Sequence, residues 1–375
     1  MMNRWKALLG TLGIAGLCFG YFAAYVPYSM MTKMATKGLF AGMDGVGFTG
    51  FQIQPIVVFA SVVSTLTFIT LAGWWKYTSK VRVLGLTLPR PKWYTLVSGI
   101  CLSGQIITTT LAYTFSGISI VFAMLLMRGG VLMMAPMVDL VALKRKRKIY
   151  WPSWVAAGLS FSALFLSLLE NGSTAITFIA AIDIGIYLFV YFFRLLFMSN
   201  RAKSECPDEL RRYFAEEQFT ANIILFTALV IVGLIGRGMA PDSIPGEIWY
   251  GFSVLPWSGF FGTLFLIGFF SWGTGLFGSL IFLDKRENTF TVPANRASSV
   301  LSGVIATYLL AEYYGQRPSN MYEMIGVGLI MFAIFFLAWR GHVVKLTVKR
   351  DKILRCAVKA EGLSAAALVK APQQA

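Results

Sequence analysis

The sequence is poor in the residues on which catalysis and metal binding depend most. It holds one histidine, His342, close to the C-terminus, and four cysteines that share no short spacing. Catalytic triads and zinc sites need histidines or clustered cysteines. We therefore expect no enzyme, no bound metal and no cofactor, and we expect the cysteines to be reduced. The sequence also lacks a phosphate-binding GxxxxGK[ST] loop, so it does not indicate an ATP-driven machine.

Charged residues are scarce too, at 13% of 375 positions, whereas hydrophobic residues make up 57% and the mean hydropathy is +0.67. Soluble domains carry about 25% charged residues, so the composition predicts an all-α integral membrane protein. Apolar stretches of about 20 residues can cross the hydrocarbon core. We expect ten transmembrane helices, at about 8–32, 52–75, 93–114, 118–143, 151–170, 174–197, 214–236, 256–283, 289–312 and 320–339.

The basic residues are distributed unevenly between the predicted loops. Most of the 33 lysines and arginines fall in alternate loops on one side, and four fall on the other, namely Lys33, Lys37, Arg237 and Arg317. Because basic loops stay in the cytoplasm, we expect both termini there and place the multi-pass protein in the cell (inner) membrane. The net charge of +16 is then mainly a topology signal, so we expect membrane lipids as partners and no nucleic acid.

Ten spans divide into two halves of five, residues 1–172 and 173–341, followed by a basic cytoplasmic tail over 342–375. An odd number of spans gives the halves opposite orientations, as in the inverted repeats of many secondary transporters. A shift of 168 residues aligns Arg128 with Arg296, and further pairs follow the same shift: Lys33 with Arg201, Phe51 with Phe219, Trp154 with Tyr322 and Gly158 with Gly326.

Arg128 and Arg296 both fall inside predicted spans. An arginine near the bilayer centre costs roughly 2.5 to 3.5 kcal/mol, so both side chains must face a cavity, a partner or water. In one interpretation they bind substrate. In the other they form static ion pairs with buried carboxylates, chiefly Asp183, the carboxylate we place near the midplane. Asp183 is also the candidate for proton coupling.

The stretch "VPANR", 292 to 296, carries a resemblance to a known family. Together with ten spans, inverted halves and cytoplasmic termini, it resembles the drug/metabolite transporter superfamily and its nucleotide-sugar-transporter branch. That branch has a Gly-Ala-Leu-Asn-Lys motif near the start of the ninth helix, whose last two residues contact substrate. The resemblance implies that Asn295 and Arg296 bind substrate, with Arg296 offering a bidentate fork to a phosphate or carboxylate.

Several further residues are candidates for the binding site or for motion. Pro136 and Pro293 interrupt predicted helices and are hinge candidates, because proline removes a backbone hydrogen bond. We place Arg194 at the membrane interface and interpret 207–218 as a short cytoplasmic amphipathic helix. The remaining substrate-binding candidates are polar or aromatic residues within predicted spans: Gln105, Tyr113, Asn222, Trp272 and Thr274.

Glycines of the eighth predicted span, among them Gly268, Gly273 and Gly278, are expected to let helices approach closely. The GxxxG pattern of Gly16 and Gly20 is most simply explained by packing within the chain, and a homodimer face is the alternative.

The sequence therefore predicts a secondary transporter or exchanger of a small organic anion, a phosphate- or carboxylate-bearing metabolite, that works by alternating access. Two alternatives stay open. One is a translocase of a lipid-linked or amphipathic phosphate, which would need a side opening to the lipid. The other is a membrane assembly factor or receptor that transports nothing and locks its arginines in salt bridges.

Overall fold

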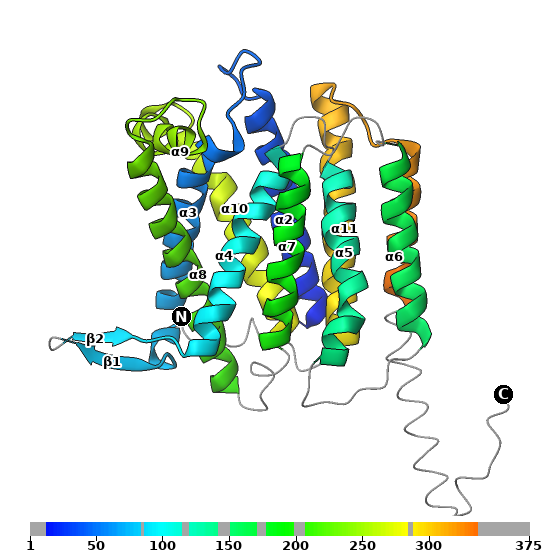
Figure 1. Cartoon of the computed structure of the whole chain (residues 1–375), viewed down its shortest axis with the longest axis horizontal. Coiled ribbons are helices and arrows are strands. Elements are labelled where there is room, and N and C mark those ends of the chain that lie inside the picture. Colours follow the sequence, from blue (N-terminus) through cyan, green and yellow to red (C-terminus); the bar gives the residue numbers. More distant parts are fainter. Residues whose placement is uncertain are drawn as a thin grey trace, which may run out of the picture.

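The computed structural model describes residues 13–83, 86–114, 120–141, 151–170, 178–198, 207–283 and 288–336. Long helices lie side by side along one direction and make up the body of the protein (Figure 1). Their bounds are α2 (Ile14–Lys37), α3 (Gly50–Leu71), α4 (Trp93–Thr114), α5 (Ile120–Val141), α6 (Trp151–Glu170), α7 (Phe178–Phe197), α8 (Pro207–Gly236), α10 (Phe261–Leu283), α11 (Asn288–Tyr314) and a final helix, Met321–Phe336.

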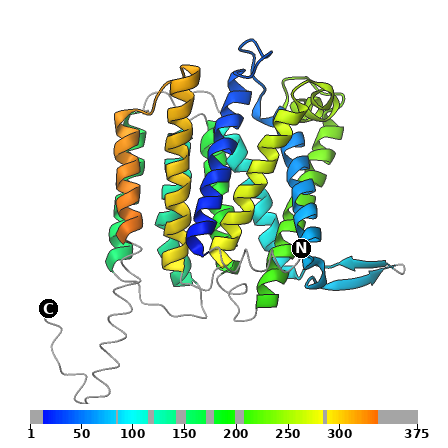
Figure 2. The ribbon, with the colours of Figure 1, turned by 180° about the vertical axis from the view of Figure 1, so that it is seen from behind.

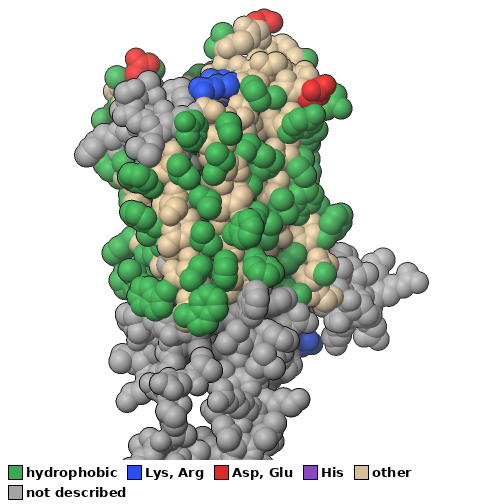
Figure 3. All heavy atoms as spheres, turned by 90° about the vertical axis from the view of Figure 1, so that its right-hand side faces the viewer, with side chains coloured by type: hydrophobic (Ala, Val, Ile, Leu, Met, Phe, Trp, Pro, Cys, Tyr) green, Lys and Arg blue, Asp and Glu red, His purple; other side chains and the backbone are tan. Residues whose placement is uncertain are grey.

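Six helices in the described part of the chain are long and apolar enough to cross a membrane: α2, α3, α4, α7, α8 and α10. The described part of the protein is mostly helical. The length and apolar composition of these six helices indicate a multi-pass membrane protein. Seen from the side of α6, hydrophobic side chains cover most of the height of the visible face, and charged side chains lie near its ends (Figure 3). Exposed phenylalanines such as Phe161 on α6 and Phe332 on the final helix suit contact with lipid.

Local signals in the sequence explain where several elements begin and end. At the start of α3, the backbone N–H of Gln52 donates to Thr49 Oγ1 at 3.3 Å and that of Thr49 donates to Gln52 Oε1 at 3.0 Å. This reciprocal pair is a capping box. Helix α2 ends at Gly38, whose φ of +66° is the left-handed conformation that glycine adopts without strain.

The all-α prediction misses a short antiparallel hairpin, β1 (Lys80–Val83) and β2 (Leu86–Pro89). It projects sideways from the lower end of the bundle, as both ribbon views show (Figures 1 and 2). The Glu216 carboxylate of α8 closes its base, because it accepts from the backbone N–H of Ser79 at 2.9 Å and of Lys92 at 3.2 Å. A carboxylate from a distant helix thus satisfies backbone donors on both sides of the hairpin.

The segment 207–218, predicted to be a short amphipathic helix leading into the next span, is helical and is the first part of a longer helix. Helix α8 runs without a break from Pro207 to Gly236, and Glu216, Glu217 and Gln218 are all buried. A short helix, α9 (Ile244–Ser253), follows α8. The carboxylates tolerate burial because each has polar partners on neighbouring elements, as described for Glu217 below.

The inner helices pack in a repeating pattern. Helix α2 lies against α10 and α11, whereas α4 lies against α7 and α8. Helix α10 also packs on α3, and α5 packs on α6, α7 and α11. Residues from six of these helices, α2, α4, α5, α7, α10 and α11, reach the centre of the bundle, where they enclose the cavity described below.

Glycines allow the closest of these contacts, as predicted for the span that becomes α10. A β-carbon added to Gly268 would lie 2.6 Å from Ala60 Cβ of α3, and Ser61 Oγ donates to the Gly268 carbonyl at 3.2 Å. Gly20, of the GxxxG pattern, faces Phe277 of α10, so this glycine serves packing within the chain. Gly259, Gly262 and Gly275 have open space and do not mediate close contacts.

Replacing Gly268 with alanine should weaken the contact between α3 and α10. Overpacking of this kind costs about 1 to 3 kcal/mol, so the thermal unfolding midpoint of the purified protein should fall. The matched control is Gly262→Ala on the same helix, where a β-carbon meets nothing within 4 Å. Equal midpoints for the two variants would show that α10 does not depend on this glycine contact.

Candidate functional site

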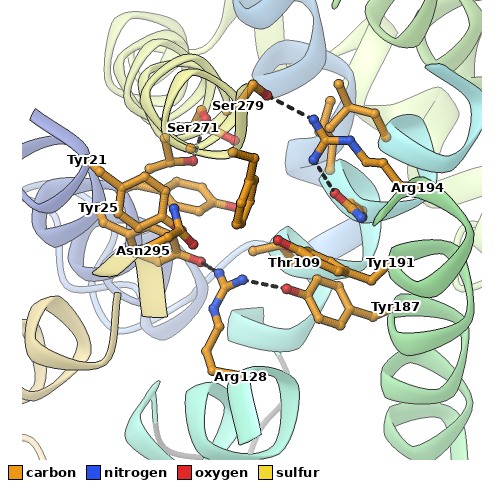
Figure 4. Close-up of a pocket in the computed structure, with 18 residues that line it drawn as sticks. Tyr21, Tyr25, Thr109, Arg128, Tyr187, Tyr191, Arg194, Ser271, Ser279 and Asn295 are labelled. Atoms are coloured by element: carbon orange, nitrogen blue, oxygen red, sulfur yellow. Dashed lines mark hydrogen bonds between the residues drawn. The ribbon is translucent and has the colours of Figure 1, made fainter. Parts of the chain in front are cut away.

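A cavity lies at the centre of the bundle and holds about 520 Å³ of space free of protein atoms, its open mouth included. Tyrosines line it from two helices: Tyr21, Tyr25 and Tyr28 from α2, and Tyr187 and Tyr191 from α7 (Figure 4). Arginine and amide side chains reach it from α4, α5, α7 and α11: Gln105, Arg128, Arg194 and Asn295. Its wall is thus aromatic and strongly hydrogen-bonding.

Arg128 extends from α5 into this cavity and is 4% exposed. Its Nη1 donates to the Tyr187 hydroxyl and its Nη2 to the Tyr25 hydroxyl (Figure 4). The guanidinium carbon lies 5.3 Å from the centre of the Tyr25 ring and 5.7 Å from that of Tyr187, within cation–π range. Its Nε atom is buried and has no partner in the described part of the chain.

Arg296 of α11 is fully buried, with 0% of its surface exposed. Its Nη2 donates to the Tyr191 hydroxyl, and the guanidinium carbon lies 4.7 Å from the centre of that ring. Among the described residues, its Nε and Nη1 atoms find no partner. Arg296 itself does not line the cavity, but the neighbouring Asn295 does, and the Asn295 Nδ2 atom is also buried without a partner there.

Two of the α2 tyrosines that line the cavity are anchored by hydrogen bonds to α4. The Tyr25 hydroxyl shares a hydrogen bond of 2.8 Å with the Tyr113 hydroxyl, and the Tyr28 hydroxyl shares one of 2.8 Å with Thr110 Oγ1. Tyr113, a predicted substrate-binding residue, therefore lies behind Tyr25 and does not line the cavity. From this place Tyr113 holds the Tyr25 hydroxyl in position.

Arg194, which the sequence placed at the membrane interface, is buried and lines the cavity. The sequence did not predict its contact with the cavity, because Glu217, the partner of Arg194, fell in the segment expected to be cytoplasmic. Arg194 Nε and Nη2 each donate to a Glu217 carboxylate oxygen at 3.0 Å. Its Nη1 donates to Gln105 Oε1 and its Nη2 to Ser279 Oγ, both at 2.9 Å. A usable signal was the spacing of Tyr187, Tyr191 and Arg194, which puts them on one face of α7.

Asp183, the predicted partner of the arginines, is 6% exposed on α7 and forms no ion pair in the described part of the chain. Its Oδ2 atom is buried without a partner there. The buried ion pair that the described residues do contain joins Arg194 to Glu217. Neither Arg128 nor Arg296 is paired with a carboxylate among them, so the static-pair interpretation finds no partner in this part of the structure.

The other predicted residues are divided between the cavity and its surroundings. Gln105 and Thr274 line it, with Thr274 Oγ1 donating to the Ser271 carbonyl at 2.7 Å. Trp272 packs on Phe68, at 5.8 Å between ring centres, and does not line the cavity.

Asn222 also lies outside the cavity, where its Nδ2 donates to Thr65 Oγ1 at 3.0 Å. Pro136 and Pro293 fall within α5 and α11, but their side chains lie outside the described ones.

The unsatisfied polar atoms at the cavity are mainly hydrogen-bond donors. Three residues that line the cavity carry buried nitrogens without a partner in the described part of the chain: Arg128 Nε, Asn295 Nδ2 and Gln105 Nε2. Beside Asn295, Arg296 Nε and Nη1 also lack a partner among these residues. Native proteins rarely leave buried polar groups unpaired, so such a group calls for a ligand, water or an ion. Donors gathered around two guanidinium groups fit a ligand that carries acceptor oxygens and negative charge.

Comparisons with known proteins add little to this geometry. No family model matches the chain, and no curated protein matches it. Sixteen chains of solved structures match. One of them, described only as "Crystal structure of protein", is 13% identical, with a TM-score of 0.47 over 87% of this chain and 98% of that chain. A likeness of this size carries no argument, so the function must be inferred from the site.

Replacing Glu217 with glutamine should destabilise the protein strongly. Removing one partner of a buried ion pair costs about 3 to 5 kcal/mol because the other charge stays buried. The control is Glu209→Gln, whose ion pair with Arg212 is partly exposed at 3.6 Å and should contribute about 0 to 1 kcal/mol. Unfolding of the purified variants measures both, and a Glu217 variant as stable as the control would contradict a structural role for the pair.

Proposed function

We propose that this protein is a secondary transporter or exchanger that moves a small organic anion by alternating access. The observation that carries the proposal is the pair of buried guanidinium groups, Arg128 and Arg296, whose described partners are tyrosine hydroxyls and rings and no carboxylates. A phosphate or carboxylate in the cavity would supply an acceptor and negative charge to Arg128, and it would lie beside Asn295, the neighbour of Arg296.

The energetic argument depends on how the membrane treats an arginine. Each guanidinium costs roughly 2.5 to 3.5 kcal/mol near the bilayer centre, and tyrosine hydroxyls and cation–π contacts offset part of that cost. A tyrosine hydroxyl is neutral, so it accepts a hydrogen bond but does not neutralise the charge of the guanidinium group. An anionic ligand neutralises it and forms charge-assisted, bidentate hydrogen bonds with the planar guanidinium.

The contacts among four helices of each half support a repeat of one half in the other. If α2 corresponds to α7, α3 to α8, α4 to α10 and α5 to α11, exchanging the halves turns one observed contact into another. The contact of α2 with α10 becomes that of α7 with α4, α10 with α3 becomes α4 with α8, and α2 with α11 becomes α7 with α5. Such symmetry is expected of inverted-repeat transporters, whose substrate site lies between the repeats.

The remaining parts of the proposal follow from the sequence. The resemblance of "VPANR" to the motif of nucleotide-sugar transporters fits Asn295 as an orienting residue beside Arg296. Asp183, buried on the same helix as Tyr187 and Tyr191, is the candidate for coupling to protons. The basic loops favour an inner-membrane location with both termini in the cytoplasm.

The test is uptake of labelled phosphate- and carboxylate-bearing anions into proteoliposomes. We expect saturable uptake that falls at least about tenfold in Arg128→Gln and in Arg296→Gln, since a hydrogen bond to a charged group contributes about 1.5 to 3 kcal/mol. The control is Arg237→Gln, an exposed arginine over the Trp249 ring, which should transport normally.

Three results would overturn the proposal. A folded protein that moves no anion would favour an assembly factor or receptor, and movement of lipid-linked phosphates alone would favour a translocase. If Arg296→Gln fails to fold and Asp183→Asn combined with Arg296→Gln restores folding, the arginine belongs to a static ion pair.

A further inference from the structure

The two tyrosine-bearing helices repeat the same pattern. Helix α2 carries Tyr21 and Tyr25, and α7 carries Tyr187 and Tyr191, each pair four residues apart and therefore on one face of its helix. The pairs are separated by 166 residues, close to the shift of 168 that aligns Arg128 with Arg296. All four tyrosines line the same cavity (Figure 4).

Each arginine bonds the second tyrosine of its own half. Arg128 donates to Tyr25, and Arg296 donates to Tyr191. These two contacts are equivalent if the halves are exchanged, since Arg128 corresponds to Arg296 and Tyr25 to Tyr191. They form the symmetric part of the site.

A third contact breaks this symmetry. Arg128 also donates across to Tyr187 of the other half and lines the cavity. The equivalent contact would join Arg296 to Tyr21, but no hydrogen bond between these two described residues is formed, and Arg296 is withdrawn from the cavity. Tyr21 nevertheless lines the same cavity as Arg128 and Asn295, the neighbour of Arg296.

We propose that Tyr187 and Tyr21 are positioning residues that present the two arginines to the anion in turn. In the state described here, Tyr187 holds Arg128 at the cavity while Arg296 is withdrawn. In the opposite state, Tyr21 holds Arg296 at the cavity, and Arg128 donates to Tyr25 but no longer to Tyr187.

The inference rests on the proposed function and on the inverted arrangement of the halves. In a protein with two inverted repeats, the second state arises when the halves exchange their conformations. Every asymmetric contact of one state is then replaced by its counterpart. The Arg128–Tyr187 bond stabilises one state, and the Arg296–Tyr21 bond stabilises the other, so removing one hydroxyl shifts the population toward the opposite state.

The test measures from which side of the membrane the cavity is open. A single reactive cysteine is introduced as Thr274→Cys, at the cavity wall, in the full chain with its native cysteines replaced by serine. Labelling by an impermeant maleimide is then compared on the two faces of oriented vesicles. Labelling reports the open side of the cavity whether or not the protein transports an anion. A wrong assignment of the tyrosines is therefore distinguishable from a wrong proposed function, which the uptake assay tests.

Tyr187→Phe should shift the ratio of labelling between the two faces by about tenfold, as expected for a lost hydrogen bond to a charged group, and Tyr21→Phe should shift it in the opposite direction. The double variant should return to the wild-type ratio. The control is Tyr28→Phe, which loses a buried hydroxyl bonded to Thr110 and should leave the ratio unchanged. Shifts in the same direction, no shift in either variant, or a double variant that does not recover would overturn the assignment.

Discussion

The site depends on how two buried positive charges are held when no described carboxylate pairs with them. Arg128 and Arg296 bond tyrosine hydroxyls and lie over tyrosine rings, which orient a guanidinium without neutralising it. This distinction matters in a membrane, where an ionisable side chain without a charged partner marks a candidate functional site. The tyrosines that line the cavity suit this way of holding a charge. Their rings contribute apolar surface, and their hydroxyls accept hydrogen bonds from the guanidinium groups.

Arg194 illustrates the opposite solution. Its guanidinium donates to both oxygens of Glu217, to Gln105 and to Ser279, so its hydrogen-bonding capacity is largely used and its charge is balanced. The network joins α4, α7, α8 and α10 at one end of the cavity. Because four helices share these hydrogen bonds, the network makes this part of the wall rigid. Arg128 and Arg296 keep guanidinium nitrogens that have no partner in the described part of the chain.

Hydrophobicity and length were enough to predict most helix positions, because the thickness of a bilayer sets the length of a span. The predicted ranges 93–114 and 151–170 coincide with α4 and α6. The hairpin at 80–89 was missed because each strand is only four residues long. The burial of Arg194 was missed because it depends on Glu217, and the charged segment that contains Glu217 has the composition of a cytoplasmic helix. The partners of a charge depend on tertiary packing, which hydropathy does not report.

The central claim is that these two arginines bind an anion, and the most direct test is an experimental structure of the protein with tungstate, an oxyanion that anomalous scattering locates. We predict a peak in the cavity within hydrogen-bond reach, about 2.7 to 3.2 Å from donor to oxygen, of Arg128, Arg296 or Asn295. A cavity without tungstate at saturating concentration, or guanidinium groups that are each clamped by a carboxylate of the protein, would contradict the claim.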